Sequence, residues 1–137
     1  MEQLRDKNIV VTGAASGIGA AVIGIAAGHG ARVVALDIDR DQGGVVAEEQ
    51  GATFYHCDVS DQSSWQAVAE TLTTEFDGID HLHLNAGIQI APPEAALQEY
   101  QFSAMTLPRY RRLIGVNIDG VVLGLHYRLP GPETQPT

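Results

Sequence analysis

The sequence predicts an α/β fold in which a parallel sheet is covered by helices on both faces. Two observations lead to this class. Four short apolar runs alternate with segments of helical spacing, and each run is closed by a glycine or a polar residue. Such alternation implies right-handed strand–helix–strand crossovers. The composition agrees, because 45% of the 137 residues are hydrophobic and 18% are charged, which suits one globular core.

The four predicted strands cover residues 8–12, 32–36, 53–57 and 79–84. Helical spacing of apolar residues fills the intervals between them. The first helix ends at Gly28-His29-Gly30, and a weaker helix covers about residues 39–49.

The third predicted helix has Ser60 as its expected N-cap, with Asp61 in the first turn. A long fourth helix runs from near Pro108 to Leu129. The apolar faces of the first, third and fourth helices are Ile18, Ala21, Val22 and Ile25; Trp65, Val68, Ala69, Leu72 and Phe76; and Tyr110, Leu113, Ile114, Val121 and Leu125.

A glycine-rich loop over residues 12–19 joins the first strand to the first helix. Its glycines, Gly13, Gly17 and Gly19, allow a tight turn that lets backbone N–H groups approach a pyrophosphate at the helix N-terminus. An ordinary glycine-rich turn is the alternative. The strand–loop–helix setting favours the nucleotide site.

Asp37 ends the second strand, where a dinucleotide fold places an acid against the adenosine ribose hydroxyls. Its carboxylate would repel a 2′-phosphate, and the glycine loop holds no Arg or Lys to offset it, although Arg40 is nearby. A capping or surface aspartate is the alternative. The expected cofactor is therefore NAD rather than NADP.

Four motifs together resemble the short-chain dehydrogenase/reductase family, in order and spacing, from about residue 6 to residue 129. They are the Thr-Gly-x-x-x-Gly-x-Gly loop at 12–19, Asp58-Val59, Asn85-Ala86-Gly87, and Val116-Asn117 with Gly120-Val121. Leu84 stands where the family has a first asparagine.

The resemblance implies a Rossmann-like doubly wound sheet with four strands in the order 3-2-1-4. It implies an incomplete NAD-binding domain over residues 1–129, followed by a tail over 130–137 that we expect to be disordered. The parent activity would be NAD-dependent hydride transfer between a secondary alcohol and a ketone. The expected cofactor-binding residues are Gly13, Ser16, Gly17, Ile18, Gly19, Asp37, Ile38, Asp58, Val59, Asn85, Ala86 and Gly87.

Asn117 is the only member of the family's catalytic tetrad in the 137 residues, with an expected structural and proton-relay role. The family's chemistry needs a tyrosine followed four residues later by a lysine, which lowers the tyrosine pKa towards working pH. The one lysine is Lys7, and no Tyr-x-x-x-Lys occurs. We expect the chain alone to be inactive, either because a C-terminal half is missing or because it is an inert nucleotide-binding or partner-binding isoform.

The net charge and the cysteine content limit the classes of partner and ligand that we expect. The net charge is −9 with eight scattered basic residues, so we expect no nucleic-acid partner. The single Cys57 excludes a multi-cysteine metal site, and no metal is expected. We expect a cytoplasmic protein with no membrane partner, whose ligand is NAD(H), with a small-molecule substrate only if the missing half is supplied. Self-association or aggregation would use the long helix and an exposed edge of the fourth strand.

Overall fold

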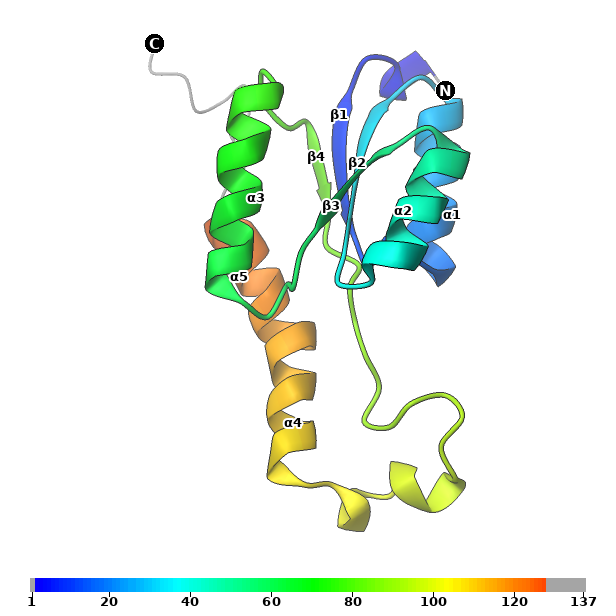
Figure 1. The fold of residues 1–137 in the computed structure, drawn as a ribbon, viewed down its shortest axis with the longest axis vertical. Coiled ribbons are helices and arrows are strands. Elements are labelled where there is room, and N and C mark those ends of the chain that lie inside the picture. Colours follow the sequence, from blue (N-terminus) through cyan, green and yellow to red (C-terminus); the bar gives the residue numbers. More distant parts are fainter. Residues whose placement is uncertain (1, 128–137) are drawn as a thin grey trace.

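The computed structural model describes residues 2–127 and contains a four-stranded parallel sheet in the order β3-β2-β1-β4 (Figure 1). The strands are β1 (Asn8–Thr12), β2 (Arg32–Asp37), β3 (Thr53–His56) and β4 (His81–His83). The predicted class and strand order are confirmed. The predicted tail over residues 130–137 lies outside the described residues.

Strand β4 is shorter than the predicted residues 79–84 because side chains take over the ladder at both ends. At its beginning, the N–H of Asn8 donates to the Asp80 carboxylate at 2.8 Å. At its end, the N–H of Asn85 donates to the Thr12 hydroxyl at 3.0 Å. Only the three residue pairs between these bonds keep strand register with β1.

Helices α1 (Gly17–Gly28) and α2 (Arg40–Gln50) cover one face of the sheet, and α3 (Gln62–Glu75) covers the other. Successive strand residues point to opposite faces, so each strand serves two cores. The core under α1 and α2 includes Ile9, Val11, Ile23, Val33, Ala35 and Ala47. The core under α3 includes Val10, Val34, Leu36, Trp65, Val68 and Leu72.

The buried face of α1 differs from the predicted one. Gly19, Ile23 and Ala26 are buried, whereas Ile18 and Ile25 are 71% and 56% exposed. Nearly every residue of this helix is apolar or glycine, so spacing could not identify the inward face. The glycine loop sets the rotation of the helix about its axis instead.

The N-cap of α3 is Asp61, not the predicted Ser60. The Asp61 carboxylate accepts from the N–H groups of Ser63 and Ser64, whereas the Ser60 hydroxyl donates to Asp58. A carboxylate one residue further along competes successfully for the same cap, since both residue types are good N-caps.

The predicted long helix is interrupted by one π-helical turn. It consists of α4 (Leu107–Ile114), the π turn η4 (Gly115–Asp119) and α5 (Gly120–His126). A π turn inserts extra chain into the helix, so a face counted at 3.6 residues per turn does not continue across it. Tyr110 and Leu125 of the predicted buried stripe, one on each side of this turn, are 47% and 62% exposed. The buried residues are Gly120 and Gly124.

Both glycines let α5 approach the rest of the protein closely. A Cβ at Gly120 would lie 2.8 Å from Val59 Cγ2, and a Cβ at Gly124 would lie 2.6 Å from Leu84 Cδ2 and 3.0 Å from Trp65. These distances are shorter than carbon atoms tolerate, so the close packing of α5 requires glycine at both positions.

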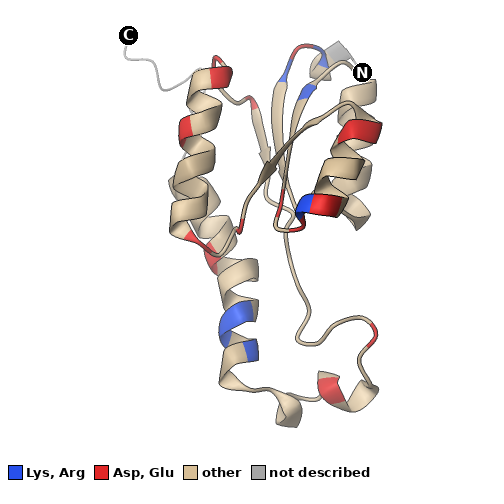
Figure 2. Ribbon diagram, viewed as in Figure 1, with Lys and Arg blue, Asp and Glu red and all other residues tan. Residues whose placement is uncertain are grey.

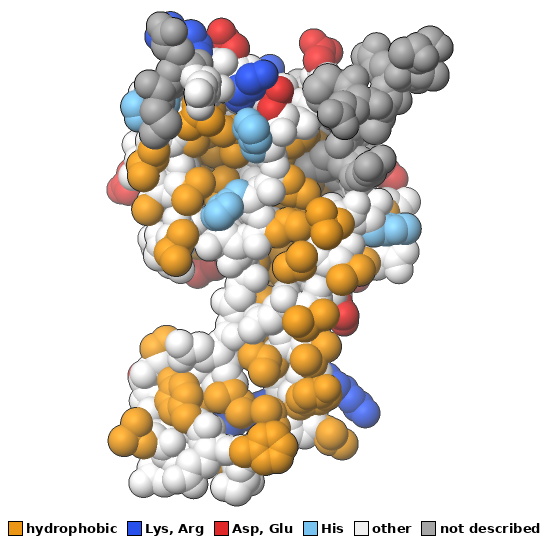
Figure 3. Space-filling view, turned by 180° about the vertical axis from the view of Figure 1, so that it is seen from behind, with side chains coloured by type: hydrophobic (Ala, Val, Ile, Leu, Met, Phe, Trp, Pro, Cys, Tyr) orange, Lys and Arg blue, Asp and Glu red, His pale blue; other side chains and the backbone are white. Residues whose placement is uncertain are grey.

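Residues 88–114, called the arm below, extend beyond the carboxyl ends of the strands (Figure 1). The arm contains two 3₁₀ turns, η2 (Leu97–Tyr100) and η3 (Phe102–Ala104), before α4. Figure 3 shows hydrophobic side chains gathered over the arm and the long helix. The exposed large hydrophobic residues of the arm and α5 include Leu97, Phe102, Leu107, Val122 and Leu125.

Between residues 2 and 127, strand β4 pairs only with β1, and its other edge has no neighbour. The expected self-association through this edge and the long helix stays a prediction. No helix in this range combines the length and the apolar character that a membrane crossing requires.

Candidate functional site

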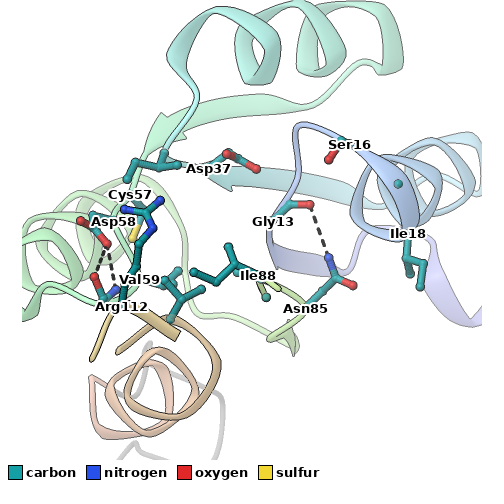
Figure 4. Close-up of a pocket in the computed structure, with 16 residues that line it drawn as sticks. Gly13, Ser16, Ile18, Asp37, Cys57, Asp58, Val59, Asn85, Ile88 and Arg112 are labelled. Atoms are coloured by element: carbon teal, nitrogen blue, oxygen red, sulfur yellow. Dashed lines mark hydrogen bonds between the residues drawn. The ribbon is translucent and has the colours of Figure 1, made fainter. Parts of the chain in front are cut away.

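A cavity of about 390 Å³ opens at the carboxyl ends of the strands, between the glycine loop and the arm (Figure 4). In doubly wound sheets, ligands bind in this crevice, where the strand order reverses. Its walls are the glycine loop, the ends of β2 and β3, the segment after β4, and the long helix. The lining residues are Gly13, Ser16, Gly17, Ile18, Asp37, Ile38, Cys57, Asp58, Val59, Ser60, Asn85, Ala86, Gly87, Ile88, Arg112 and Val116.

The glycine loop forms the wall at the N-terminus of α1. Gly13 and Gly17 have φ angles of +67° and +55°, which favour glycine. Ser16, the N-cap of α1, makes no side-chain capping bond. The first N–H groups of a helix lack acceptors within the helix, so they suit an anionic ligand.

Gly19 is the one predicted cofactor-binding residue that does not line the cavity. It is buried behind the loop, where a Cβ would lie 2.0 Å from the carbonyl oxygen of Gly13. Its hydrogen side chain lets the loop close on α1. The structure therefore gives Gly19 a packing position instead of a contact position.

Asp37 lies in the middle of the cavity wall with its carboxylate fixed by two backbone bonds. One oxygen accepts from Ala15 in the glycine loop at 2.9 Å. The other accepts from Asp39 at 2.9 Å. Each oxygen keeps a lone pair for a ligand hydroxyl. The carboxylate is therefore fixed beside the loop with lone pairs available to a ligand.

Beyond Asp37, the cavity continues to a more apolar end formed by Ile38, Cys57, Asp58, Val59 and Ser60, called the β3 end below. Burial raises the pKa of the Cys57 thiol to about 11, which keeps it neutral. The Asp58 carboxylate accepts from the Ser60 backbone N–H at 3.0 Å and from its hydroxyl at 2.6 Å.

Thr12 joins the glycine loop to the segment after β4. Its buried hydroxyl accepts from the N–H groups of Asn85 and Ala86, at 3.0 and 3.1 Å. The Asn85 amide donates in return to the carbonyl of Thr12 at 3.2 Å. These bonds set the distance between the two walls at the other end of the cavity, where Asn85, Ala86 and Gly87 lie.

Asn117 lies behind the cavity wall, in the π turn. Its Nδ2 donates to the carbonyl of Ile88 at 2.9 Å, and its Oδ1 accepts from the N–H of Ile88 at 2.8 Å. This pair of bonds ties the long helix to the start of the arm. The structural and proton-relay role expected for Asn117 stays a prediction.

No site role was predicted for six residues that line or brace the cavity, namely Thr12, Cys57, Ser60, Ile88, Arg112 and Val116. Some signals were available: Cys57 and Ser60 flank the expected Asp58-Val59 pair, and Ile88 follows Gly87. Arg112 lies on α4 and Val116 in the π turn, and nothing in their spacing indicates that both meet the cavity.

The family model described as short chain dehydrogenase matches residues 7–132. The chain is 34% identical to a mitochondrial borneol dehydrogenase from Lavandula x intermedia, over 90% of this chain and 46% of that protein. It is also 34% identical to a D-threitol dehydrogenase from Mycolicibacterium smegmatis, over 88% of this chain and 45% of that protein.

A solved structure of a metagenomic short-chain oxidoreductase in complex with NADP superposes with a TM-score of 0.78, at 28% identity. The match covers 91% of this chain and 56% of the other. The chain belongs to the short-chain dehydrogenase/reductase family, as its motifs indicated. It spans about half the length of the curated relatives that it matches.

Proposed function

We propose that the chain binds NAD(H) in the cavity and supplies the cofactor side of an enzyme that transfers hydride between a secondary alcohol and a ketone. The anchored carboxylate of Asp37 carries this proposal, because it lies beside the glycine loop with lone pairs available. The dehydrogenase names of the relatives support the reaction class.

In this proposal the dinucleotide lies across the cavity, with its adenine at the β3 end and its nicotinamide ribose at the opposite end. Ser16, Gly17 and Ile18 at the start of α1 would face the pyrophosphate, and Asp37 the adenosine ribose. Ile38, Asp58 and Val59 would surround the adenine. Asn85, Ala86 and Gly87 would flank the nicotinamide ribose at the opposite end.

The choice of NAD over NADP follows from the charge at Asp37. A 2′-phosphate would be pressed against a carboxylate that two backbone bonds hold in position. The solved relative in complex with NADP is 28% identical to this chain over the match. The proposed preference for NAD therefore rests on this chain's own residues.

Titration of the purified 137-residue chain with NADH and NADPH tests the proposal. We expect NADH to bind at least tenfold more tightly, and Asp37→Asn to reduce that ratio because the repulsive charge is removed. Asp41→Asn is the matched control, since Asp41 is an exposed carboxylate outside the cavity. Equal affinities in the unmodified chain, or tighter binding of NADPH, would contradict the assignment of Asp37.

We also propose that residues 1–137 alone bind without turnover. No tyrosine in them is followed by lysine at the fourth position. A catalytic tyrosine needs a lowered pKa. Partial burial and the neighbouring Glu75 instead raise the pKa of Tyr55 to about 12. A panel of secondary alcohols with NAD should give no reduction above the blank. Turnover that is lost in Asn117→Ala, measured on identically purified protein, would contradict this.

A further inference from the structure

Arg112 lines the cavity from α4, and no ligand contact was predicted for it from the sequence. It lies on α4, where Figure 2 shows a group of basic residues, whereas the chain around the cavity carries acids such as Asp37 and Asp58. Figure 4 shows its side chain extending from the helix into the cavity, toward the β3 end, where Cys57, Asp58 and Val59 lie.

The guanidinium of Arg112 has no internal partner between residues 2 and 127. The two ion pairs in this range are Lys7–Asp80 and Arg109–Glu99. Neither acid of the cavity wall forms an ion pair with it: Asp58 accepts twice from Ser60 through Oδ1, and Asp37 accepts from Ala15 and Asp39. A planar cation thus remains available to a ligand.

The surroundings of this cation favour a flat, uncharged partner. Ile38 and Val59 supply aliphatic surface at the β3 end, and the Cys57 thiol stays neutral because burial raises its pKa. A guanidinium is weakly hydrated and stacks on the faces of aromatic rings. Beside the hydrogen-bonded Asp58–Ser60 pair, the β3 end therefore offers aliphatic side chains and one planar cation to a ring system.

We propose that Arg112 is a further cofactor-binding residue of this site, which stacks on the adenine ring of the nucleotide. The inference rests on the NAD binding proposed above. An anionic partner, such as a 2′-phosphate, is disfavoured because it would lie beside the fixed carboxylate of Asp37 in the same cavity. The ring at the β3 end meets no such repulsion.

Substitution of Arg112 tests the contact by NADH and NADPH titration. Arg112→Met keeps the aliphatic stem and removes the planar cation, so both cofactors should bind roughly three- to thirtyfold more weakly, by a common factor. Arg112→Lys should not restore the affinity, because an ammonium group is a point charge and lacks the flat face.

The matched control is Arg111→Met, which removes the same charge from the neighbouring exposed position of α4, outside the cavity. It should leave both affinities within about twofold. Circular dichroism melts of the three variants should coincide with that of the unmodified chain, since both arginines are exposed.

Each other outcome overturns the inference in a different way. Unchanged affinity in Arg112→Met means that the residue touches no ligand, while NADH binding by the unmodified chain would still support the proposed function. A loss confined to NADPH, or full rescue by Arg112→Lys, means that the arginine binds a phosphate. A chain that binds neither cofactor refutes the proposed function and the inference with it.

Discussion

The sheet with its covering helices and the arm are built in different ways, although both contribute walls to the cavity. The two cores draw their buried residues from positions 9–79, including the fully buried Val10, Val34, Leu36 and Trp65. In the arm, residues 88–114, Ala91 is the one buried hydrophobic residue. Packing thus fixes the walls around Asp37 and Val59, while a few polar bonds fix the wall made by the arm.

The largest difference should appear when one leucine is truncated in each region. Leu72 on α3 is 1% exposed, whereas Leu97 in the arm is 84% exposed. Leu72→Ala leaves a cavity in the core and should lower the free energy of unfolding by about 2–5 kcal/mol. Leu97→Ala should change it by less than about 0.5 kcal/mol.

Urea denaturation followed by circular dichroism measures both leucine variants under the same conditions. Equal losses would mean that the arm packs on the rest of the protein as firmly as α3 does. The contrast between the two regions would then be wrong.

A smaller but still measurable loss of stability is expected when Thr12 is substituted. Thr12→Val keeps the shape and removes the hydroxyl that accepts from Asn85 and Ala86. Leaving the Ala86 N–H without a partner, and the Asn85 N–H with only the His83 carbonyl at 3.0 Å, should cost about 2 kcal/mol of stability. NADH binding should weaken as well, because the loop and the segment after β4 lose their spacing. Thr12→Ser keeps the acceptor and should retain both stability and binding in the same melts and titrations.

The smallest effect on the free energy of unfolding is expected at Asn117, which joins the two regions. Asn117→Ala removes both bonds to Ile88 and should cost about 1 kcal/mol of stability. The local effect is larger, since the arm is held by few other contacts. Limited proteolysis should cut the arm faster in this variant.

Gln98→Ala is the control for Asn117, because it removes an exposed amide from the arm itself. Cleavage rates that are the same in Asn117→Ala, Gln98→Ala and the unmodified chain would show that the Asn117 bonds do not hold the arm.

Sequence reasoning succeeded where the chain carries local chemistry. The strand order and the Asp58-Val59 pair followed from the family resemblance, while the loop glycines and Asp37 were predicted because their residue types meet requirements of backbone conformation or charge. All expected cofactor-binding residues except Gly19 line one cavity.

The inward faces of the helices could not be predicted, because they depend on contacts with residues far along the chain. The inward face of α1 could not be read from a helix that is apolar almost all round. The π turn at 115–119 shifted the face of the long helix without a signal in residue spacing. The same shift decides where Arg112 lies relative to the cavity, so no local pattern could assign it to the site.

Trp65 gives the cavity an optical reporter. It is the single tryptophan of the sequence and is fully buried, and its indole N–H donates to the carbonyl of Val59 at 2.9 Å. The fluorophore is therefore attached to a residue of the cavity wall and shielded from quenching by water. A reduced nicotinamide absorbs where indole emits, so energy transfer from one known position should follow ligand occupancy without any added label.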